Sequence, residues 1–311
     1  MRMPGGLMSN LPVITGLGEV LWDVYPDAAH FGGAPANFAS HAASLGAEAW
    51  MVSAVGADDF GDRALAALRE LGVHCDHLAQ DPHHATGRVL VTLDAAGVAS
   101  YEFAADTAWD HLVWTDGLAA LAARCDAVCF GTLGQRSPDS RETIRRFLQA
   151  TPPAALRVFD VNLRQRFYDA EIIRTSLQLA SALKLNDEEL PIVAELCGVR
   201  ANTPREILIM LMTRYELRLA ALTCGPRGSL LISTDAEDEC PAPRTAVVDT
   251  VGAGDAFTAT LVTGFLRGLP LAEINRHANA VAAFVCSQNG ATPPLPDSLR
   301  GPTFQYRAER R

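Results

Sequence analysis

The stretch Asp249-Thr250-Val251-Gly252-Ala253-Gly254-Asp255-Ala256-Phe257 places a Gly-Ala-Gly turn directly before an apolar run with helical spacing. Glycine permits such a sharp turn and leaves no side chain in front of the peptide amides. Unpaired amides at the start of a helix favour a bound anion. The 252–254 amides would hold a migrating phosphoryl group while Asp255 accepts the proton of a hydroxyl group. The alternative is a plain strand-to-helix turn, with an acid that complements the helix dipole.

The same helix start bears on the basicity of Asp255. A helix N-terminus should lower the pKa of a carboxyl group in its first turn and make that group a weak base. A sugar hydroxyl that attacks a loose transition state loses its proton late, so positioning can matter more than basicity.

Composition limits the classes of protein to consider. A chain of 311 residues with 49% hydrophobic and 20% charged residues suits one large α/β domain with a small appendage. The net charge of −10 argues against nucleic acid or an anionic membrane as a partner, because both attract a basic surface. Met1–Asn10 lacks the apolar core of a signal peptide, and no apolar run approaches the ~18 residues that span a bilayer. We therefore expect a soluble, cytoplasmic protein.

Cysteine, lysine and histidine usage adds three expectations. The seven cysteines include no Cys-x-x-Cys pair, which predicts reduced, buried thiols. Lys184 is the only lysine and is followed by Leu185, so the chain has no Gly-Lys-Ser/Thr of a P-loop. Phosphate charge must then be met by amides, arginine and a divalent metal. The pair His83-His84 has no partner at metal-binding spacing and predicts an exposed loop.

Strand and helix patterns alternate along most of the chain, which predicts a mostly parallel sheet with helices on both faces. The first strand, Val13 to Leu21, should bend at its glycines. Arg88 to Leu93 and Ala99 to Phe103 flank Asp94–Gly97 and indicate a separate hairpin, a candidate lid that excludes water. The other predicted strands are 50–55, 127–130, 158–161, 182–185 and 219–223. The predicted helices are 36–45, 58–71, 138–149, 170–179, 188–197, 204–215, 254–267 and 271–287.

Ordered motifs make the chain resemble the ribokinase-like (PfkB) family of carbohydrate kinases, whose signature takes the form Asp-Thr-x-Gly-Ala-Gly-Asp at 249–255. The other motifs are Gly32-Gly33-Ala34-Pro35-Ala36-Asn37, Asp160-Val161-Asn162-Leu163-Arg164, Asn186-Asp187-Glu188-Glu189 and Thr223-Cys224-Gly225-Pro226-Arg227-Gly228. The resemblance covers almost the whole chain. It implies one domain over 1–311, with a three-layer α/β/α ribokinase-like fold, a mostly parallel central sheet and a small β lid from roughly 19–34 and 86–106.

The resemblance also implies a sugar pocket beside the catalytic acid. Its residues would be Asp23, Gly32, Gly33, Asn37 and Arg164. By pattern alone, Asp23 is equally well explained as a turn acid before Pro26, and the glycine loop as a plain turn with a helix start. Arg164 would reach phosphate or substrate, or would instead form an ion pair with Asp160.

The implied nucleotide-binding residues are Asn186, Glu189, Thr223, Gly225, Gly228 and Asn279. Glu189 would act on Mg²⁺ through water, since Mg²⁺ keeps several of its waters. The pair of Asn186 and Glu189 also fits a helix capping box. Without the resemblance, 223–228 would be a turn that joins two strands, and Asn279 a surface amide. A monovalent-cation site for K⁺, formed mostly by backbone carbonyls, would comprise Asp249, Val251, Val285 and Gly290.

Within the family, the sequences of segments 18–23, 31–37 and 108–110 most resemble those of bacterial fructokinases. It implies that ATP phosphorylates D-fructose to fructose 6-phosphate. The nearest alternative is a 2-keto-3-deoxygluconate kinase, whose substrate carboxylate would want an added cation such as Arg88 or Arg164. Nucleoside kinases are a further alternative, but the resemblance of the N-terminal motifs to fructokinases argues against them. The resemblance also implies a homodimer through the lid.

Two alternatives come from other classes of protein. A non-catalytic sugar or nucleotide sensor could keep the fold, although the acid, both glycines and the Asn-x-x-Glu pair argue against it. A dinucleotide-dependent dehydrogenase fails, because Leu21 stands where the third glycine of its fingerprint should be.

Overall fold

The computed structural model describes residues 11–93 and 99–301, and its centre is a nine-stranded sheet in the order β13-β12-β11-β10-β9-β8-β1-β4-β5. From β11 to β5 along this order the strands run parallel, and β12 and β13 are antiparallel additions at one edge. The strands are β1 (Val13–Leu17), β4 (Glu48–Gly56), β5 (Leu78–Asp81), β8 (Ala127–Phe130), β9 (Leu156–Asp160), β10 (Ala182–Asn186), β11 (Leu219–Thr223), β12 (Ser229–Ser233) and β13 (Glu237–Cys240). The predicted mostly parallel sheet is confirmed.

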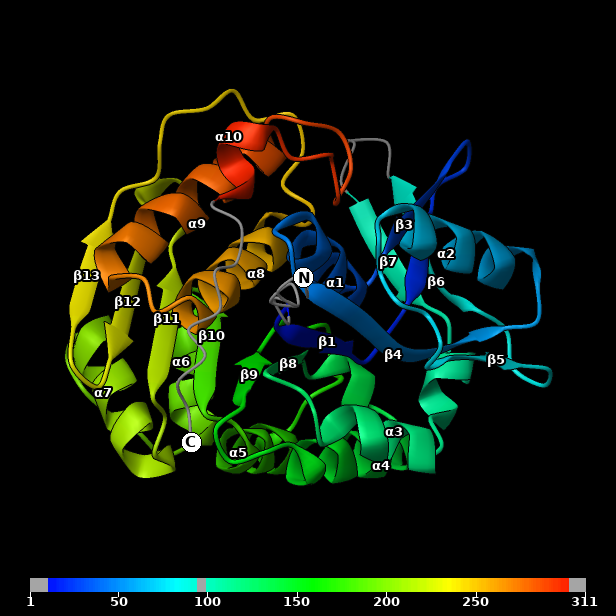
Figure 1. Ribbon diagram of the computed structural model, residues 1–311, viewed down its shortest axis with the longest axis horizontal. Helices are drawn as coiled ribbons and strands as arrows, with labels where there is room; N and C mark the ends of the chain where they lie inside the picture. The colour runs from blue at the N-terminus through cyan, green and yellow to red at the C-terminus, as the bar shows by residue number, and fades with distance from the viewer. Residues whose placement is uncertain (1–10, 94–98, 302–311) are drawn as a thin grey trace, which may run out of the picture.

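Helices cover both faces of this sheet (Figure 1). One layer holds α1 (Ala34–Ser44), α8 (Ala253–Leu266) and α9 (Leu271–Cys286). The other holds α3 (Asp116–Ala122), α4 (Pro138–Ala150), α5 (Ala170–Leu179), α6 (Glu189–Leu196) and α7 (Pro204–Tyr215). Alternate residues of each strand serve the two layers: in β8, Val128 and Phe130 join the α3–α7 cluster, while Ala127 and Cys129 join the other. The central strands β1, β8, β9, β10 and β11 are therefore mostly apolar, as strands buried on both faces require, whereas the edge strands β5 and β13 carry exposed polar residues.

A second sheet of four strands, in the order β3-β2-β6-β7, lies to one side of the first together with α2 (Asp59–Glu70) (Figure 1). Its strands are β2 (Leu21–Val24), β3 (Ala29–Gly32), β6 (Gly87–Leu93) and β7 (Ala99–Phe103), all within the ranges expected for the lid. The chain passes from β1 into β2 through Gly18, whose φ of 146° is the bend that the sequence predicts. The expected turn at Asp94–Gly97 and the segment Met1–Asn10 lie outside the described residues.

The two faces of the small sheet have different environments. In β2, Trp22 packs on Phe60 of α2, with ring centroids 5.6 Å apart. The next residue, Asp23, points to the opposite face, because side chains alternate along a strand. Its neighbour across the pairing is Val89 of β6, which is 2% exposed. On the Asp23 face, Leu21 and Val89 pack against Trp109 and Leu133, whereas Trp22 packs in the cluster that includes α1, α2 and β4.

The sequence patterns missed β5, β13, α3 and the short α10 (Asp297–Arg300). Each is brief, and β5 carries Gln80 and Asp81 in a four-residue strand, so neither length nor periodicity marks it. The seven cysteines are all free; Cys224, Cys240 and Cys286 are partly exposed, so the expectation of buried thiols holds only for the other four.

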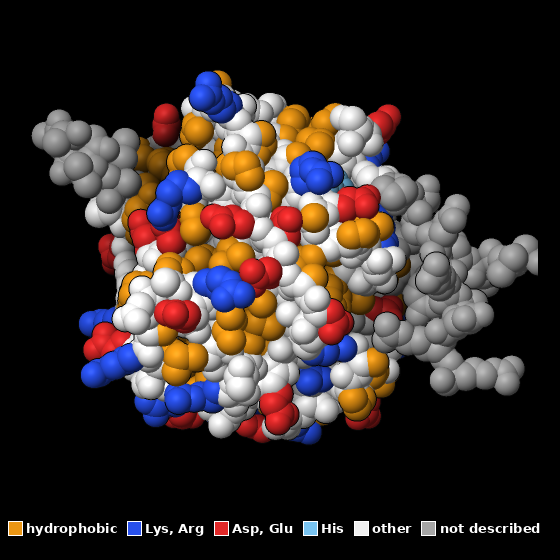
Figure 2. All heavy atoms as spheres, turned by 90° about the vertical axis from the view of Figure 1, so that its left-hand side faces the viewer, with side chains coloured by type: hydrophobic (Ala, Val, Ile, Leu, Met, Phe, Trp, Pro, Cys, Tyr) orange, Lys and Arg blue, Asp and Glu red, His pale blue; other side chains and the backbone are white. Residues whose placement is uncertain are grey.

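Surface chemistry on the face beside β12, β13 and α7 is mixed: acidic, basic and apolar side chains are interspersed (Figure 2). Within the described part of the chain, no helix combines the length and apolar character needed to cross a bilayer.

Candidate active site

The start of α8 forms the turn that the sequence singled out. Gly252 caps the helix with a φ of 78°, and a Cβ atom there would lie 2.3 Å from the carbonyl oxygen of Ala291. Only glycine fits this position. Among the described residues none accepts a hydrogen bond from the amides at 252, 254 and 255, and the amide of Ala253 makes only a long one, 3.4 Å, to the Thr250 carbonyl. The helix start thus keeps unpaired donors, as an anion site requires.

Asp255 lies in the first turn of α8 and contacts the predicted sugar loop directly. Its Oδ2 accepts a hydrogen bond of 2.8 Å from Nδ2 of Asn37, in α1. Asn37 is 3% exposed, and its Oδ1 is buried without a partner. Gly33, which caps α1, has a φ of 108°, and a Cβ atom there would lie 2.6 Å from the Glu19 carbonyl oxygen. Two motifs more than 200 residues apart in the chain therefore share one hydrogen bond.

The expectation that Asp255 is a weak base is wrong. Burial, followed by the nearby Asp160 carboxylate, raises the pKa of Asp255 to about 6, although Asn37, Lys184 and Arg164 oppose the shift. Desolvation penalises the charged form and outweighs the stabilising contacts. A carboxylate with this pKa is ionised at neutral pH and is a better proton acceptor than a free aspartate.

A buried ion pair between Lys184 and Asp160 lies next to the glycine turn at 252–254. Lys184 of β10 is 7% exposed, and its Nζ lies 3.0 Å from Oδ1 of Asp160 at the end of β9. Thr258 of α8 donates a 2.8 Å hydrogen bond to the other oxygen of Asp160. A Cβ atom at Gly254 would lie 3.1 Å from the Lys184 ammonium. The only lysine therefore places a positive charge directly under the glycine turn.

Sequence reasoning noticed Lys184 only to exclude a P-loop. A usable signal was present: one charged side chain lies in the apolar run Ala182–Leu185, which was predicted to be a strand of a sheet covered on both faces. Such a charge must be paired in the interior. Asp160 is that partner, so the alternative that Asp160 pairs with Arg164 is wrong.

Arg164 is exposed and donates from Nη1 to its neighbour's carbonyl, that of Leu163, at 3.1 Å. Its charge nevertheless opposes the rise in the pKa values of Glu19, Asp23 and Asp255, so the guanidinium lies near these three acids. Burial raises the pKa of Glu19 to about 7, and Oε2 of this side chain has no hydrogen-bond partner. Sequence reasoning did not select Glu19.

Asp23 is the third residue of β2 and shares its face of the small sheet with Leu21. Burial raises its pKa, against the opposing charges of Arg164 and His30. A Cβ atom at Gly32 would lie 3.4 Å from Oδ2 of Asp23, so the glycine of β3 leaves this carboxylate uncovered. Gly32 of the glycine loop thus lies beside Asp23, and Asn37 bonds to Asp255. That these residues bind a sugar stays a prediction.

Asn186 and Glu189 form the capping box at the start of α6. The Asn186 side chain accepts hydrogen bonds from the amides of Glu188 and Glu189, at 3.0 and 2.8 Å. Glu189, which is 6% exposed, accepts one bond of 2.9 Å from the Asn186 amide and another of 2.9 Å from Leu163. Both carboxylate oxygens are therefore already engaged by the backbone, and only their remaining lone pairs could face a hydrated ion.

The 223–228 segment joins β11 to β12, as the pattern alone suggested, through the 3₁₀ turn η3 (Gly225–Arg227). Arg227 of this turn forms an ion pair with Asp187, which ties the segment to the start of α6. Asn279 is not a surface amide: it is 6% exposed and donates to Oγ of Ser229 at 2.7 Å and to the Asn275 carbonyl at 2.9 Å. It holds α9 against β12.

The four residues of the expected K⁺ site converge in part. Asp249 accepts hydrogen bonds from the amides of Val251, at 3.0 Å, and Gly290, at 3.2 Å. The Val285 carbonyl accepts the Gln288 amide at the end of α9, at 3.0 Å. The Asp249 carboxylate thus connects the segment before α8 to the segment after α9 through these hydrogen bonds.

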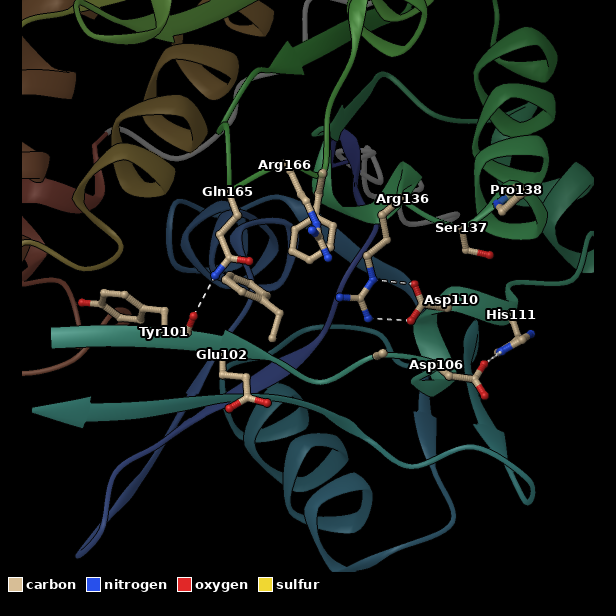
Figure 3. Close-up of a pocket in the computed structure, with 13 residues that line it drawn as sticks. Tyr101, Glu102, Asp106, Asp110, His111, Arg136, Ser137, Pro138, Gln165 and Arg166 are labelled. Carbon is tan, nitrogen blue, oxygen red and sulfur yellow. Dashed lines mark hydrogen bonds and ion pairs between the residues drawn. The ribbon is translucent and has the colours of Figure 1, made fainter.

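A cavity of about 540 Å³ lies elsewhere, at the β7 edge of the small sheet (Figure 3). It is lined by β7, the 3₁₀ turn η1 (Ala108–His111), the start of α4 and residues 165–167, and by none of the predicted site residues. The Arg136 guanidinium crosses it to pair with Asp110, with Nη2 and Oδ2 2.6 Å apart. This cavity is therefore a neighbour of the proposed reaction centre and not the centre itself.

Comparison with known proteins agrees with this arrangement. Residues 27–298 match the family described as pfkB family carbohydrate kinase. The chain is 31% identical over 279 residues to the putative sugar kinase PH1459 of Pyrococcus horikoshii (87% of this chain, 85% of that protein). It is 31% identical over 289 residues to the aminoimidazole riboside kinase of Salmonella typhimurium (86% of each chain). The crystal structure of Xylella fastidiosa fructokinase with bound ATP superposes with a TM-score of 0.82 at 25% identity, covering 93% of this chain and 96% of that one.

The fold and the site together define an ATP-dependent sugar kinase. The chain belongs to the pfkB family of carbohydrate kinases.

Proposed function

We propose that this kinase transfers the γ-phosphoryl group of ATP to the primary hydroxyl of D-fructose and produces fructose 6-phosphate. One observation carries the proposal: the acid at the open start of α8 is hydrogen-bonded to Asn37 of the glycine loop, at 2.8 Å. Asp255 would then act as the proton acceptor between an anion at the 252–254 amides and a polyhydroxyl substrate at the glycine loop, the arrangement that transfer to a sugar needs.

In the proposed step, the hydroxyl oxygen attacks the γ-phosphorus and its proton passes to Asp255. The bond to the bridging oxygen breaks, and ADP leaves. The 252–254 amides would hold the charge that spreads over the phosphoryl oxygens, with the Lys184 ammonium beneath them. Mg²⁺ would offset the charge on the phosphates, and Glu189 and Asn186 would reach it through water, since their oxygens already bond to the backbone.

The choice of sugar rests on the position of the arginines. Arg88 of β6 pairs with Trp22 in the small sheet, and its guanidinium lies 5.7 Å from the Phe60 ring of α2. It therefore faces away from Asp23. Arg164 is exposed, and its charge acts on the acids Glu19, Asp23 and Asp255. This balance favours a neutral sugar over the carboxylate of 2-keto-3-deoxygluconate. The aminoimidazole riboside kinase relative supports a riboside as the second candidate.

The decisive experiment measures ADP release from Mg-ATP with fructose, 2-keto-3-deoxygluconate, ribose and aminoimidazole riboside. We expect the highest kcat/KM with fructose, and Asp255→Asn should abolish turnover. Asp116→Asn is the matched control, because Asp116 also begins a helix, α3, on the opposite face of the sheet. A higher kcat/KM with another substrate would overturn the assignment to fructose, and no stimulation by any sugar would favour a sensor.

A further inference from the structure

The structure gives the His83-His84 loop a partner that the sequence did not reveal. His84, on the connection from β5 to β6, lies against His111 of η1, with ring centroids 3.7 Å apart and planes 15° apart. Asp106, on the connection from β7 to η1, accepts a hydrogen bond from Nε2 of His111 at 2.7 Å. Asp106 and His111 line one end of the cavity in Figure 3. The expectation that His84 has no partner at metal-binding distance is therefore wrong.

The geometry points to a metal site: we propose that His84, Asp106 and His111 bind a divalent transition-metal ion such as Zn²⁺ at the base of the small sheet. One ligand atom from each residue lies within 4.8 Å of the others. A tetrahedral ion about 2.0–2.1 Å from each ligand needs ligand atoms about 3.3 Å apart. The Asp106 oxygen lies 2.7 Å from Nε2 of His111 and 3.9 Å from Nε2 of His84, so shifts of about half an ångström would suffice for these two pairs.

Both rings have Nε2 near Asp106, but they stack with planes 15° apart, so they would have to turn apart before both nitrogen lone pairs could face one ion. Nδ1 of His84 lies 2.8 Å from Oδ2 of Asp81, and Nδ1 of His111 lies 3.8 Å from Oδ2 of Asp139. In each ring one nitrogen faces an outer carboxylate and leaves Nε2 to face Asp106. Histidines that bind metals commonly have their second nitrogen held by a carboxylate, which fixes the tautomer and the ring orientation. Asp81 holds His84 in this way at 2.8 Å, whereas the 3.8 Å between His111 and Asp139 is too long for a hydrogen bond.

The charge around the cluster also favours a cation. Asp81, Asp106 and Asp139 surround two imidazoles, and every ion pair that these carboxylates form within residues 11–93 and 99–301 goes to one of the two rings. With neutral rings, three negative charges face the cluster. A divalent ion would offset most of that charge, and mixed imidazole and carboxylate ligands suit Zn²⁺, Co²⁺ or Ni²⁺ better than Mg²⁺.

The position of the cluster suggests what the ion would do. His84 precedes β6 by three residues, and Asp106 follows β7 by three. An ion held by both residues and by His111 would fasten the two ends of the small-sheet hairpin to η1. This inference rests on the described contacts alone and does not depend on which sugar is phosphorylated.

Binding is tested with Co²⁺ as the probe, on nucleotide-free, chelator-treated full-length protein at about pH 8. We expect one equivalent of Co²⁺ with the visible absorption of a tetrahedral site, displaced by Zn²⁺. His84→Ala should lose this signal, and Asp81→Asn should weaken binding by about 10- to 100-fold.

Two further variants test whether Co²⁺ binding is specific to the cluster and whether its loss reflects misfolding. His83→Ala is the matched control: the residue is adjacent and exposed but lies outside the cluster, so its variant should bind Co²⁺ like the parent. Asp106→Asn should fold normally, because asparagine tolerates the left-handed conformation of this residue (φ 53°), but Zn²⁺ should no longer raise its Tm. Equal Co²⁺ binding by the parent and by the His84→Ala and His83→Ala variants would overturn the proposal.

Discussion

Two helices of this kinase begin at the carboxyl edge of the same sheet, and their starts are built in opposite ways. At α6, Asn186 and Glu189 fill the backbone donors with their own side chains. At α8, Gly252 caps the helix without a side-chain bond, and none of the described residues accepts from the amides at 254 and 255. The first start is closed by the protein, and the second is left open.

The same difference extends to the acids. Glu189 is buried, but it bonds to two backbone amides. Asp255 receives one side-chain bond, from Asn37, and its pKa is raised to about 6 by burial and by Asp160. A carboxylate whose oxygens all accept hydrogen bonds stabilises the fold. A buried carboxylate with few hydrogen bonds has a raised pKa and can accept a proton from a substrate. The comparison predicts that loss of Asp255 affects mainly rate and loss of Glu189 mainly stability.

The largest effect should come from Asp255→Asn. The amide can still accept the hydrogen bond from Asn37 but cannot take a proton, so kcat should fall by about 10²- to 10⁴-fold while the fold is kept. The unfolding free energy should not fall, because the variant removes a charge that burial disfavours. Steady-state kinetics and urea unfolding at pH 8 measure both. A loss of activity matched by a loss of folded protein would contradict the open-start interpretation.

The next largest effect concerns the cation under the turn. Lys184→Met leaves Asp160 buried without its ammonium partner and should lower the unfolding free energy by about 3–5 kcal/mol. The double variant Lys184→Met/Asp160→Asn should recover much of that loss, because no uncompensated charge remains. Urea unfolding of the three proteins gives the comparison. If the double variant is as unstable as the single one, packing and not charge explains the role of Lys184.

Sequence patterns predicted most of the parallel sheet, both helix layers and the glycine turn at the start of α8, because each rests on local spacing or on an ordered motif. They could not give the contacts that depend on long-range packing. Nothing local links Lys184 to Asp160 or His84 to His111, and the raised pKa of Asp255 follows from neighbours contributed by other strands and helices. The buried position of Asn279 was missed for the same reason.

A smaller effect is expected in the pH profile. Because the pKa of Asp255 is raised to about 6, the base is protonated below that pH, and kcat/KM should fall about tenfold per pH unit there. Activity should level off above about pH 7, where the carboxylate is ionised. Glu19, whose pKa is raised to about 7, is the competing group. Glu19→Gln should keep the limb near pH 6; if the limb disappears in this variant, Glu19 and not Asp255 is the group that titrates.

The smallest effect should come from the closed start of α6. Glu189→Gln removes the charge but keeps one acceptor, so it should lower the unfolding free energy by about 1 kcal/mol and raise the KM for Mg-ATP only a few-fold. Glu206→Gln is the matched control, because Glu206 forms a capping box with Thr203 at the start of α7, remote from the cleft. If the two variants lose similar stability and only Glu189→Gln changes the KM for Mg-ATP, the α6 box also serves the nucleotide. Unchanged KM in both variants would mean that the box is structural alone, and the proposed water-mediated contact of Glu189 with Mg²⁺ would be wrong.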